Sequence, residues 1–452
     1  MPYRSVPGRT ILATATLTLT AVLSGIHSAA PSAAAPSPQL VNRAAAAGIN
    51  WSSTPSWDVS VVDYDNDGDT DFAMSLHMKN AGELRRNNGD GTFTKVASSS
   101  NLATTIMPRP SPQGSLVDRH ACTWADFDHN GRQDAYCTAG RYRSNRYKVE
   151  GINNELFMQS SAGVFSDTAT ASGVGEPCTR GRHAAPIDVN GDGWMDLAYG
   201  AQVERSDADD PCNDEANYPY NEQSKIFVNR GADNNGNWLG FRFGTEWNVS
   251  QGNSGNRLML PWDYDKDGDT DLLAATFPNK PAFLYRNNRN PNNGTGFTEV
   301  ARNGTVPLPL FNGATVADIA GDSNLDLVFA DNTGFAYRLG TATGISTTTV
   351  RIGTVPSSGD GWSTAVADIN GDGMLDVYGL VASATSTGNP ADFVYVRQAN
   401  GSWQPHEVPA AGGDANDVAA VTINNRAQFV VLNGGNDEAE EPGPVQLIAW
   451  NG

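Results

Sequence analysis

The chain has 452 residues and a formal net charge of -20, with 50 acidic and 30 basic side chains. So acidic a chain is a poor partner for nucleic acid or for an anionic membrane surface, and we expect neither. The length allows two or three ordinary domains or one large repeat array.

The N-terminal segment has the composition of a secretory signal peptide. Arg4 and Arg9 precede an apolar, Thr-rich run from Ile11 to Ile26, and small residues follow as far as Ala35. No later stretch approaches the ~18 unbroken apolar residues of a membrane span, and no Cys lies near Ala30 to accept a lipid. We therefore predict a signal peptide at 1–35, a mature domain at 36–452, and a secreted, extracellular, monomeric protein without membrane insertion.

The chain has four cysteines, Cys122, Cys137, Cys178 and Cys212. An even number in an exported chain predicts two disulfides, although the spacing permits three connectivities. Pairing of Cys122 with Cys137 and of Cys178 with Cys212 is favoured, because the first pair flanks an acidic turn almost symmetrically.

One acidic turn of nine residues recurs along the chain. Its six copies are residues 63–71, 126–134, 188–196, 263–271, 318–326 and 368–376, and their first residues step by 63, 62, 75, 55 and 50. A period of this size indicates a solenoid or propeller array.

Each turn is followed by a short apolar run such as Phe72–Ser75, then by a segment ending in Asn or Gly, and in several units by a fourth segment such as Thr92–Val96. Four strands per unit make a propeller blade. The tail, 413–452, is a degenerate seventh unit that stops one strand short, and Gln39–Arg43 resembles the missing strand. We therefore predict an all-β, seven-bladed propeller of four-stranded blades, closed by the N-terminal strand in the last blade, which leaves no open sheet edge.

The acidic turns have the residue types that Ca²⁺ requires. This hard cation takes six to eight oxygen ligands, and alternate residues of a tight loop converge on one centre. Positions 1, 3, 5 and 9 offer side chains, and position 7 offers its carbonyl. Up to six calcium sites are predicted, with these ligands: Asp63, Asp65, Asp67, Asp69 and Asp71; Asp126, Asp128, Asn130, Arg132 and Asp134; Asp188, Asn190, Asp192, Trp194 and Asp196; Asp263, Asp265, Asp267, Asp269 and Asp271; Asp318, Asp322, Asn324 and Asp326; Asp368, Asn370, Asp372, Met374 and Asp376.

The six turns are not equivalent. The fifth has Ala320 in place of a ligand and Ser323 in place of the turn glycine, so it should bind most weakly. None has the Glu at the twelfth position that a helix-loop-helix calcium site requires, because the chain enters a strand there.

The run Asn87–Thr94 after a DxDxDGxxD loop resembles the FG-GAP or VCBS repeat proteins, whose relatives include the integrin α-subunit propeller. The resemblance spans nearly the whole predicted mature chain. It implies a seven-bladed propeller with calcium loops between the first two strands of a blade. The Phe-Gly and Gly-Ala-Pro signatures of integrin repeats are poorly kept, and integrin function is therefore not carried over.

If the calcium loops lie on one face, the starts of the first strands lie on the other, where function is expected to concentrate. The candidate ligand-binding residues there are Trp57, Arg119, His120, Arg182, His183, Arg257 and Trp362, with Arg141 and Arg143 on the basic loop 140–148. An Arg cluster suits an anionic group such as a uronate. Alternatively, the basic loop pairs with the acidic loop 206–220, and His120 and His183 are hydrogen-bonded structural residues.

We expect a noncatalytic recognition or adhesion module for polysaccharide or an extracellular protein. The alternative is a calcium-assisted polysaccharide lyase, in which basic residues neutralise a uronate while a His, Lys or Tyr abstracts the neighbouring proton. A structural surface protein is a third possibility. No catalytic residue is assigned, because spacing places no acid-base pair, and neither a nucleophile elbow nor a CxxC pair occurs.

Overall fold

The computed structural model describes residues 39–50, 56–76, 82–96, 119–140, 153–176, 179–202, 224–247, 249, 256–276, 282–289, 296–302, 308–356, 358–383, 390–410, 415–434 and 443–451. Contacts divide the chain into Met1–Ser37 and Pro38–Gly452. Everything below concerns the second unit. The predicted signal peptide, the loops 141–152 and 206–220, and both Cys178 and Cys212 lie outside the described residues.

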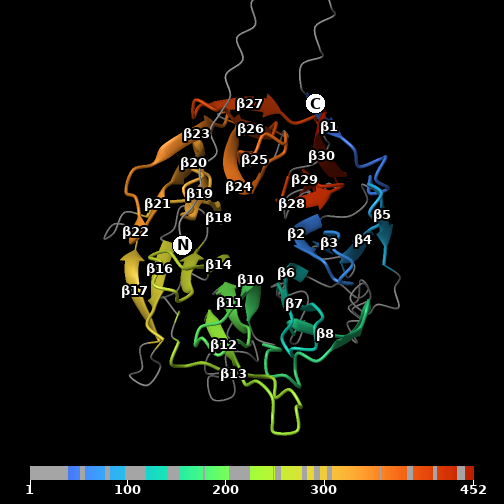
Figure 1. Cartoon of the computed structure of the whole chain (residues 1–452), viewed down its shortest axis with the longest axis vertical. Helices are drawn as coiled ribbons and strands as arrows, with labels where there is room; N and C mark the ends of the chain where they lie inside the picture. Colours follow the sequence, from blue (N-terminus) through green and yellow to red (C-terminus); the bar gives the residue numbers. More distant parts are fainter. Residues whose placement is uncertain are drawn as a thin grey trace, which may run out of the picture. The chain divides into compact units, whose positions relative to one another are not determined.

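The regular elements of the described residues are strands, which form seven four-stranded antiparallel sheets (Figure 1). Blade 1 comprises β2 (Ser56–Val62), β3 (Asp71–Leu76), β4 (Glu83–Asn87) and β5 (Phe93–Lys95). Blade 2 comprises β6 (Arg119–Ala125), β7 (Asp134–Ala139), β8 (Glu155–Ser161) and β9 (Val164–Asp167). Blade 3 comprises β10 (Arg180–Ile187), β11 (Asp196–Gln202), β12 (Lys225–Asn229) and β13 (Phe241–Phe243).

Blade 4 comprises β14 (Leu258–Trp262), β15 (Asp271–Ala275), β16 (Ala282–Asn287) and β17 (Phe297–Arg302). Blade 5 comprises β18 (Gly313–Ala317), β19 (Asp326–Asp331), β20 (Gly334–Arg338) and β23 (Val350–Thr354), with the small hairpin β21 (Gly340–Thr341) and β22 (Gly344–Ile345) before the last strand. Blade 6 comprises β24 (Gly359–Ala367), β25 (Asp376–Ser383), β26 (Phe393–Arg397) and β27 (Trp403–Glu407). Blade 7 comprises β28 (Asp417–Ile423), β29 (Arg426–Leu432), β30 (Val445–Asn451) and β1 (Gln39–Asn42).

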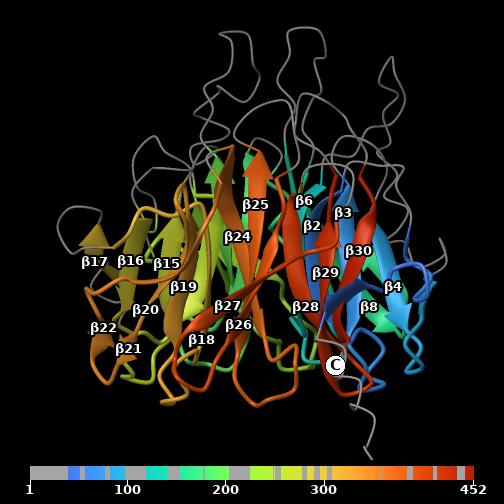
Figure 2. The ribbon, with the colours of Figure 1, turned by 90° about the horizontal axis from the view of Figure 1, so that it is seen from above.

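The first strands of the blades face the centre, and the fourth strands lie outermost (Figure 1). Consecutive first strands contact one another in the order β2, β6, β10, β14, β18, β24, β28 and again β2. The ring is therefore complete, and Figure 2 shows its blades standing side by side. Among the described residues no helix is long and apolar enough to cross a membrane.

The core lies between blades rather than at the centre of the ring. Seven clusters of buried apolar residues occur among the described residues, and each is shared by two consecutive blades. The middle strands are covered on both faces, which is why β7, β12 and β15 are buried along their whole length. The outermost strands β5 and β9 each bury a single Phe.

The last blade contains both ends of the described unit, which confirms the predicted closure. β1 pairs antiparallel with β30, so that Gln39 lies opposite Asn451. Leu40 is buried in the cluster between blades 6 and 7, and Ile49 is buried in the cluster between blades 7 and 1. Blade 7 has no acidic loop: Asn424 and Asn425, with φ of 52° and 59°, make a two-residue hairpin turn between β28 and β29.

Candidate functional site

Each acidic loop, numbered 1 to 6 with its blade, joins the first and second strands of that blade. The loop begins with an Asp whose carboxylate caps the turn. Asp63 Oδ1 and Oδ2 accept the N–H groups of Asp67 and Gly68 at 3.1 and 2.9 Å, and Asp126, Asp188 and Asp368 act in the same way. These bonds close the loop around its own carboxylates.

The sixth residue of each loop has a left-handed conformation. It is glycine in five loops, with φ between 83° and 90°, and Ser323 in the fifth, with φ of 68°. The serine therefore keeps the turn at the cost of a conformation that L side chains disfavour.

The ninth residue of each loop is a buried Asp that holds two segments of backbone. Asp71 accepts the N–H of Tyr64 through Oδ2 at 3.1 Å and that of Asn87 through Oδ1 at 2.7 Å. Burial is the largest cause that raises the pKa of Asp71 to about 7. The equivalent residues, each fully buried and each with two such bonds, are Asp134, Asp196, Asp271, Asp326 and Asp376.

In three loops the carboxylates converge closely enough to share a metal ion. The groups are Asp63, Asp65 and Asp71; Asp126, Asp128 and Asp134; and Asp263, Asp265 and Asp271, each with ligand atoms within 4.8 Å of one another. These are the loops with Asp at the third position. Loops 3 and 6 have Asn190 and Asn370 there, and loop 5 has Ala320.

Two of these loops contain carboxylate oxygens that have no hydrogen-bond partner although they are buried. They are Asp65 Oδ1 in loop 1, and Asp263 Oδ1 and Asp265 Oδ1 in loop 4. A buried anionic oxygen without a donor is costly unless a cation faces it. The donor set of carboxylate oxygens therefore fits a hard divalent cation.

Basic side chains border the same two loops. Arg86 donates to Asp65 Oδ2 at 2.7 Å and to Asp67 Oδ2 at 3.0 Å, whereas Asp65 Oδ1 accepts no hydrogen bond. In loop 4, Arg289 pairs with Asp269 and donates to the carbonyl of Gly268. Neither arginine was identified from the sequence, since the residues that contact a loop from another strand are set by the blade's pairing.

At the opposite end of the first strands, four of the predicted ligand-binding residues lie at β-bulges. The strand register shifts at Trp57, His120, Arg182 and Trp362, which occupy equivalent positions in blades 1, 2, 3 and 6. The structural equivalent of His120 is therefore Arg182, and His183 is one residue further along. A bulge redirects the side chain of the extra residue, and bulges are frequent beside functional sites.

Several of these side chains contact one another across blades. Arg182 donates to His120 Nδ1 at 2.7 Å, with both residues buried. The Arg257 guanidinium lies over the Trp362 ring, 5.5 Å from its centroid, and thus joins blade 4 to blade 6. The structure describes the backbone of Trp57, whereas Arg141 and Arg143 lie outside the described residues.

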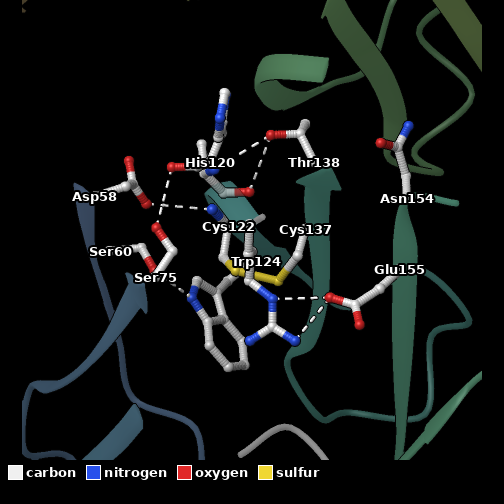
Figure 3. Close-up of a disulfide and its surroundings, with 12 residues drawn as sticks. Asp58, Ser60, Ser75, His120, Cys122, Trp124, Cys137, Thr138, Asn154 and Glu155 are labelled. Carbon is white, nitrogen blue, oxygen red and sulfur yellow. Dashed lines mark hydrogen bonds and ion pairs between the residues drawn. A yellow bond between two sulfur atoms is a disulfide. The ribbon is translucent and has the colours of Figure 1, made fainter. Parts of the chain in front are cut away.

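Arg119 makes a buried ion pair with Glu155 on β8, at 2.7 Å. Figure 3 shows Glu155 near the disulfide of Cys122 and Cys137, which joins β6 and β7 and confirms the first predicted pairing. Asp58 of blade 1 accepts the N–H of Cys122 at 3.2 Å. Glu155 was not a sequence candidate, because nothing in its local sequence distinguishes it from other strand residues.

His183 is a structural acceptor. Its Nδ1 accepts the N–H of Met259 in the next blade at 3.3 Å, and burial lowers the pKa of His183 to about 4. His183 is consequently neutral at physiological pH, and the contact joins blades 3 and 4.

Asp58 and Asp417 lie on neighbouring first strands, and Asp417 Oδ2 accepts the N–H of Val59 at 2.9 Å. Burial, and then the charge of Asp417, raises the pKa of Asp58, and burial raises that of Asp417 from 3.8 to about 7. Between pH ~3.8 and about 7, Asp417 is therefore protonated more in the folded state than in the unfolded state. The stability that protonated Asp417 contributes is fully present below pH ~3.8 and is lost as the pH rises through about 7.

We expect Asp417→Asn to stabilise the protein at pH 8 by on the order of 2 to 4 kcal/mol relative to wild type, and to have little effect below pH 4. The amide keeps an oxygen for the N–H of Val59 and removes the buried charge. Melting temperatures of both proteins across this pH range test the expectation. A difference that does not vary with pH would contradict it.

The fold and its loops define a class: a seven-bladed β-propeller with Asp-rich loops in the first hairpin of six blades. The FG-GAP-like repeat matches residues 63–137, 126–199, 263–329 and 318–379, which together span more than half of the chain. The chain therefore belongs to the FG-GAP-like repeat family, as the sequence resemblance predicted.

Among curated proteins no match to the chain is found. Many solved structures are similar to it, including the following two. One, titled as specific recognition of non-reducing terminal N-acetylglucosamine by a lectin of Agrocybe aegerita, has 16% identity and a TM-score of 0.45 over 78% of this chain and 80% of that one. The other, a protein from Lactobacillus plantarum, has 8% identity and a TM-score of 0.44 over 88% of this chain and 100% of that one. Both are too distant for a function to be transferred.

Proposed function

We propose that this protein is a secreted, calcium-binding β-propeller that recognises a polysaccharide or an extracellular protein. The observation that carries the calcium assignment is the set of buried, partnerless oxygens of Asp65, Asp263 and Asp265. Calcium bound there would supply the positive charge that these oxygens lack and would hold the first hairpins of blades 1 and 4 in one geometry. Residues 1–35, proposed as the signal peptide, would bring the chain to a calcium-rich compartment.

The proposed sites differ in ligand number, and their order of affinity follows. Asp63→Asn and Asp263→Asn should lower the melting temperature in saturating calcium more than Asp318→Asn, because loop 5 has Ala320 at its third position. All three residues accept backbone N–H groups within their loops, so the three variants should be alike in excess chelator. The reverse order in calcium would overturn the proposed ranking.

Recognition is assigned to the end of the ring that carries the bulged residues. His120, Arg182 and Trp362 occupy equivalent positions there, and the Arg257–Trp362 contact places a cation and an aromatic face together. Such a pair can stack on a sugar ring and pair with its carboxylate. Arg119 is held by Glu155, so its proposed role is to support the site rather than to meet ligand.

A binding screen of the mature protein against neutral and uronate-containing polysaccharides, with and without calcium, tests the recognition proposal. Saturable binding that is weakened at least fivefold by Trp362→Ala, while Arg351→Ala in the β20–β23 pair of blade 5 leaves it unchanged, supports it. Ultraviolet absorbance is followed in the same samples, since growing absorbance from unsaturated uronate products would instead identify a lyase. Absence of both signals would exclude the polysaccharides tested and direct the search to a protein partner.

A further inference from the structure

One residue at or near the end of the third strand connects each of several acidic loops to the loop of the preceding blade. Gln159 donates its backbone N–H to Asp134 Oδ1 at 2.7 Å, and its side-chain Nε2 to the carbonyl of Tyr64 in loop 1 at 3.0 Å. Tyr64 in turn donates its own N–H to Asp71 Oδ2 at 3.1 Å. A continuous path therefore joins the ninth residue of loop 1 to that of loop 2.

The same path is repeated in the next two blades. Asn229 donates its N–H to the ninth Asp of loop 3 at 2.7 Å and its side chain to the carbonyl of Phe127 in loop 2 at 2.9 Å. Asn287 donates its N–H to the ninth Asp of loop 4 at 2.7 Å and its side chain to the carbonyl of Val189 in loop 3 at 2.9 Å. Phe127 and Val189 each donate to the ninth Asp of their own loops. Loops 1 to 4 are thus linked in series.

The series is interrupted between blades 4 and 5. The equivalent residue of blade 5 is Gly340, whose N–H still reaches Asp326 Oδ1 at 2.7 Å but which has no side chain to extend to loop 4. A Cβ at Gly340 would lie 2.2 Å from the carbonyl oxygen of Leu325, so a larger residue does not fit. A hydrogen bond that crosses this junction in the described residues lies on the surface, where Lys266, the fourth residue of loop 4, donates to the carbonyl of Ser323, the sixth residue of loop 5, at 2.8 Å.

A second series begins after the interruption. Arg397 in blade 6 donates its N–H to Asp376 Oδ1 at 2.9 Å, and its guanidinium donates to the carbonyl of Ile319 in loop 5. The peptide group of Ile319 and Ala320 also supplies the N–H that Asp326 Oδ2 accepts at 2.9 Å. Loops 5 and 6 are therefore linked to each other.

Two of the junctions in the first series have an additional, exposed link. The fourth residue of a loop donates to the carbonyl of the sixth residue of the next: Asn66 to Gly131 at 2.8 Å, and His129, depending on its tautomer, to Gly193 at 3.1 Å. The His129 ring also stacks on Trp194, with 3.9 Å between centroids and 8° between planes. Loops 2 and 3 are thus connected both inside the ring and on its surface.

We propose that the acidic loops respond to cations as two groups: loops 1 to 4 bind cooperatively, and loops 5 and 6 bind as a separate pair. The proposal rests on the proposed calcium function. A cation that fixes the ninth Asp of a loop also fixes the loop backbone that donates a hydrogen bond to that Asp. The side chain of the linking residue connects this backbone to the ninth Asp of the neighbouring loop. The first cation therefore bears the conformational entropy cost of ordering both loops, and the second cation binds more tightly because its loop is already ordered.

The test uses terbium as the probe, because Trp194 lies in loop 3 and can sensitise terbium luminescence there. The component that disappears in Trp194→Phe reports loop 3 together with loop 2, whose His129 stacks on the same ring, and the part that remains in the loop 2 variant reports loop 3 alone. Loop 2 is disabled by Asp126→Asn with Asp128→Asn, and loop 5, as the matched control, by Asp318→Asn with Asp322→Asn. We expect disabling loop 2 to weaken terbium binding at loop 3 by about fivefold, and disabling loop 5 to leave it unchanged.

The linking residues are then removed. In Asn229→Ala the effect of loop 2 on loop 3 should fall sharply, and in His129→Ala, an exposed change that spares the core, it should shrink; in the double variant it should vanish. Titration midpoints rather than intensities are compared, since His129 contacts the reporter. An effect that persists undiminished in folded His129→Ala and Asn229→Ala, or an equal effect of loop 5, would overturn the coupling. Independent binding at all loops would also refute it, whereas absence of terbium and calcium binding in wild type would refute the proposed function itself.

Discussion

A chain of residues 51–452 is expected to melt at a markedly lower temperature than a chain of residues 36–452 and to aggregate. The deletion removes β1 and with it the buried side chains of Leu40 and Ile49, which belong to two different interblade clusters. Each contributes about 1.5 to 3 kcal/mol of burial, and the lost ladder bonds bring the total to on the order of 5 kcal/mol. The deletion also exposes the edge of β30 to intermolecular pairing. Calorimetry and light scattering measure both effects.

Point substitutions distinguish the loss of β1 packing from the effect of shortening the chain. Leu40→Ala should cost about 2 to 4 kcal/mol, because the side chain is buried between blades 6 and 7. Arg43→Ala, in the exposed turn after the same strand, should have no measurable effect. A truncated chain that melts at the temperature of the complete one would show that blade 7 does not need its fourth strand.

Removal of calcium with excess chelator is expected to have an effect of similar or greater size. A ligand that binds only the folded state stabilises it by about 2.7 kcal/mol per site when its free concentration is 100 times Kd. Several occupied sites together would add on the order of 10 kcal/mol to the free energy of unfolding, and the protein would lose this stabilisation when the ions are removed. Melting in calcium and in chelator gives the difference directly.

Magnesium provides the control, because it demands a smaller, stricter octahedral site and loses its water reluctantly. Restoration of the melting temperature by calcium but not by magnesium would identify the ion. An identical melting temperature in calcium and in chelator would rule out the calcium assignment, and the unpartnered oxygens of Asp65, Asp263 and Asp265 would then need another partner.

The blade architecture could be predicted from the sequence because its signals are local. An acidic turn and the apolar run that follows it lie within a dozen residues, and their recurrence at 63, 126, 188, 263, 318 and 368 repeats one structural unit. Blade 7 was predictable even without an acidic loop, since its strands keep the apolar pattern of the others. The pairing of Cys122 with Cys137 followed from the same hairpin geometry.

The contacts between blades could not be predicted in this way. Gln159, Asn229 and Asn287 lie at or near the ends of strands of ordinary composition, and only the packing of neighbouring blades brings their amides to another loop's backbone. The bulges that make His120 equivalent to Arg182 depend on strand register, which the sequence leaves open by one residue. The role of Glu155 follows only from the folded structure, in which the blade's strand pairing brings Glu155 on β8 into an ion pair with Arg119.

The pairing of Gln39 with Asn451 determines how the molecule can be made. β1 pairs with residues that are synthesised after all the other blades, so the ring cannot close until β30 has been produced. Contacts between such distant residues form slowly, and closure is therefore a late step in folding. Under the proposed export of an unfolded chain, the ring would remain open during translocation and its final blade would form on the far side, where calcium would meet loops whose backbone is not yet locked.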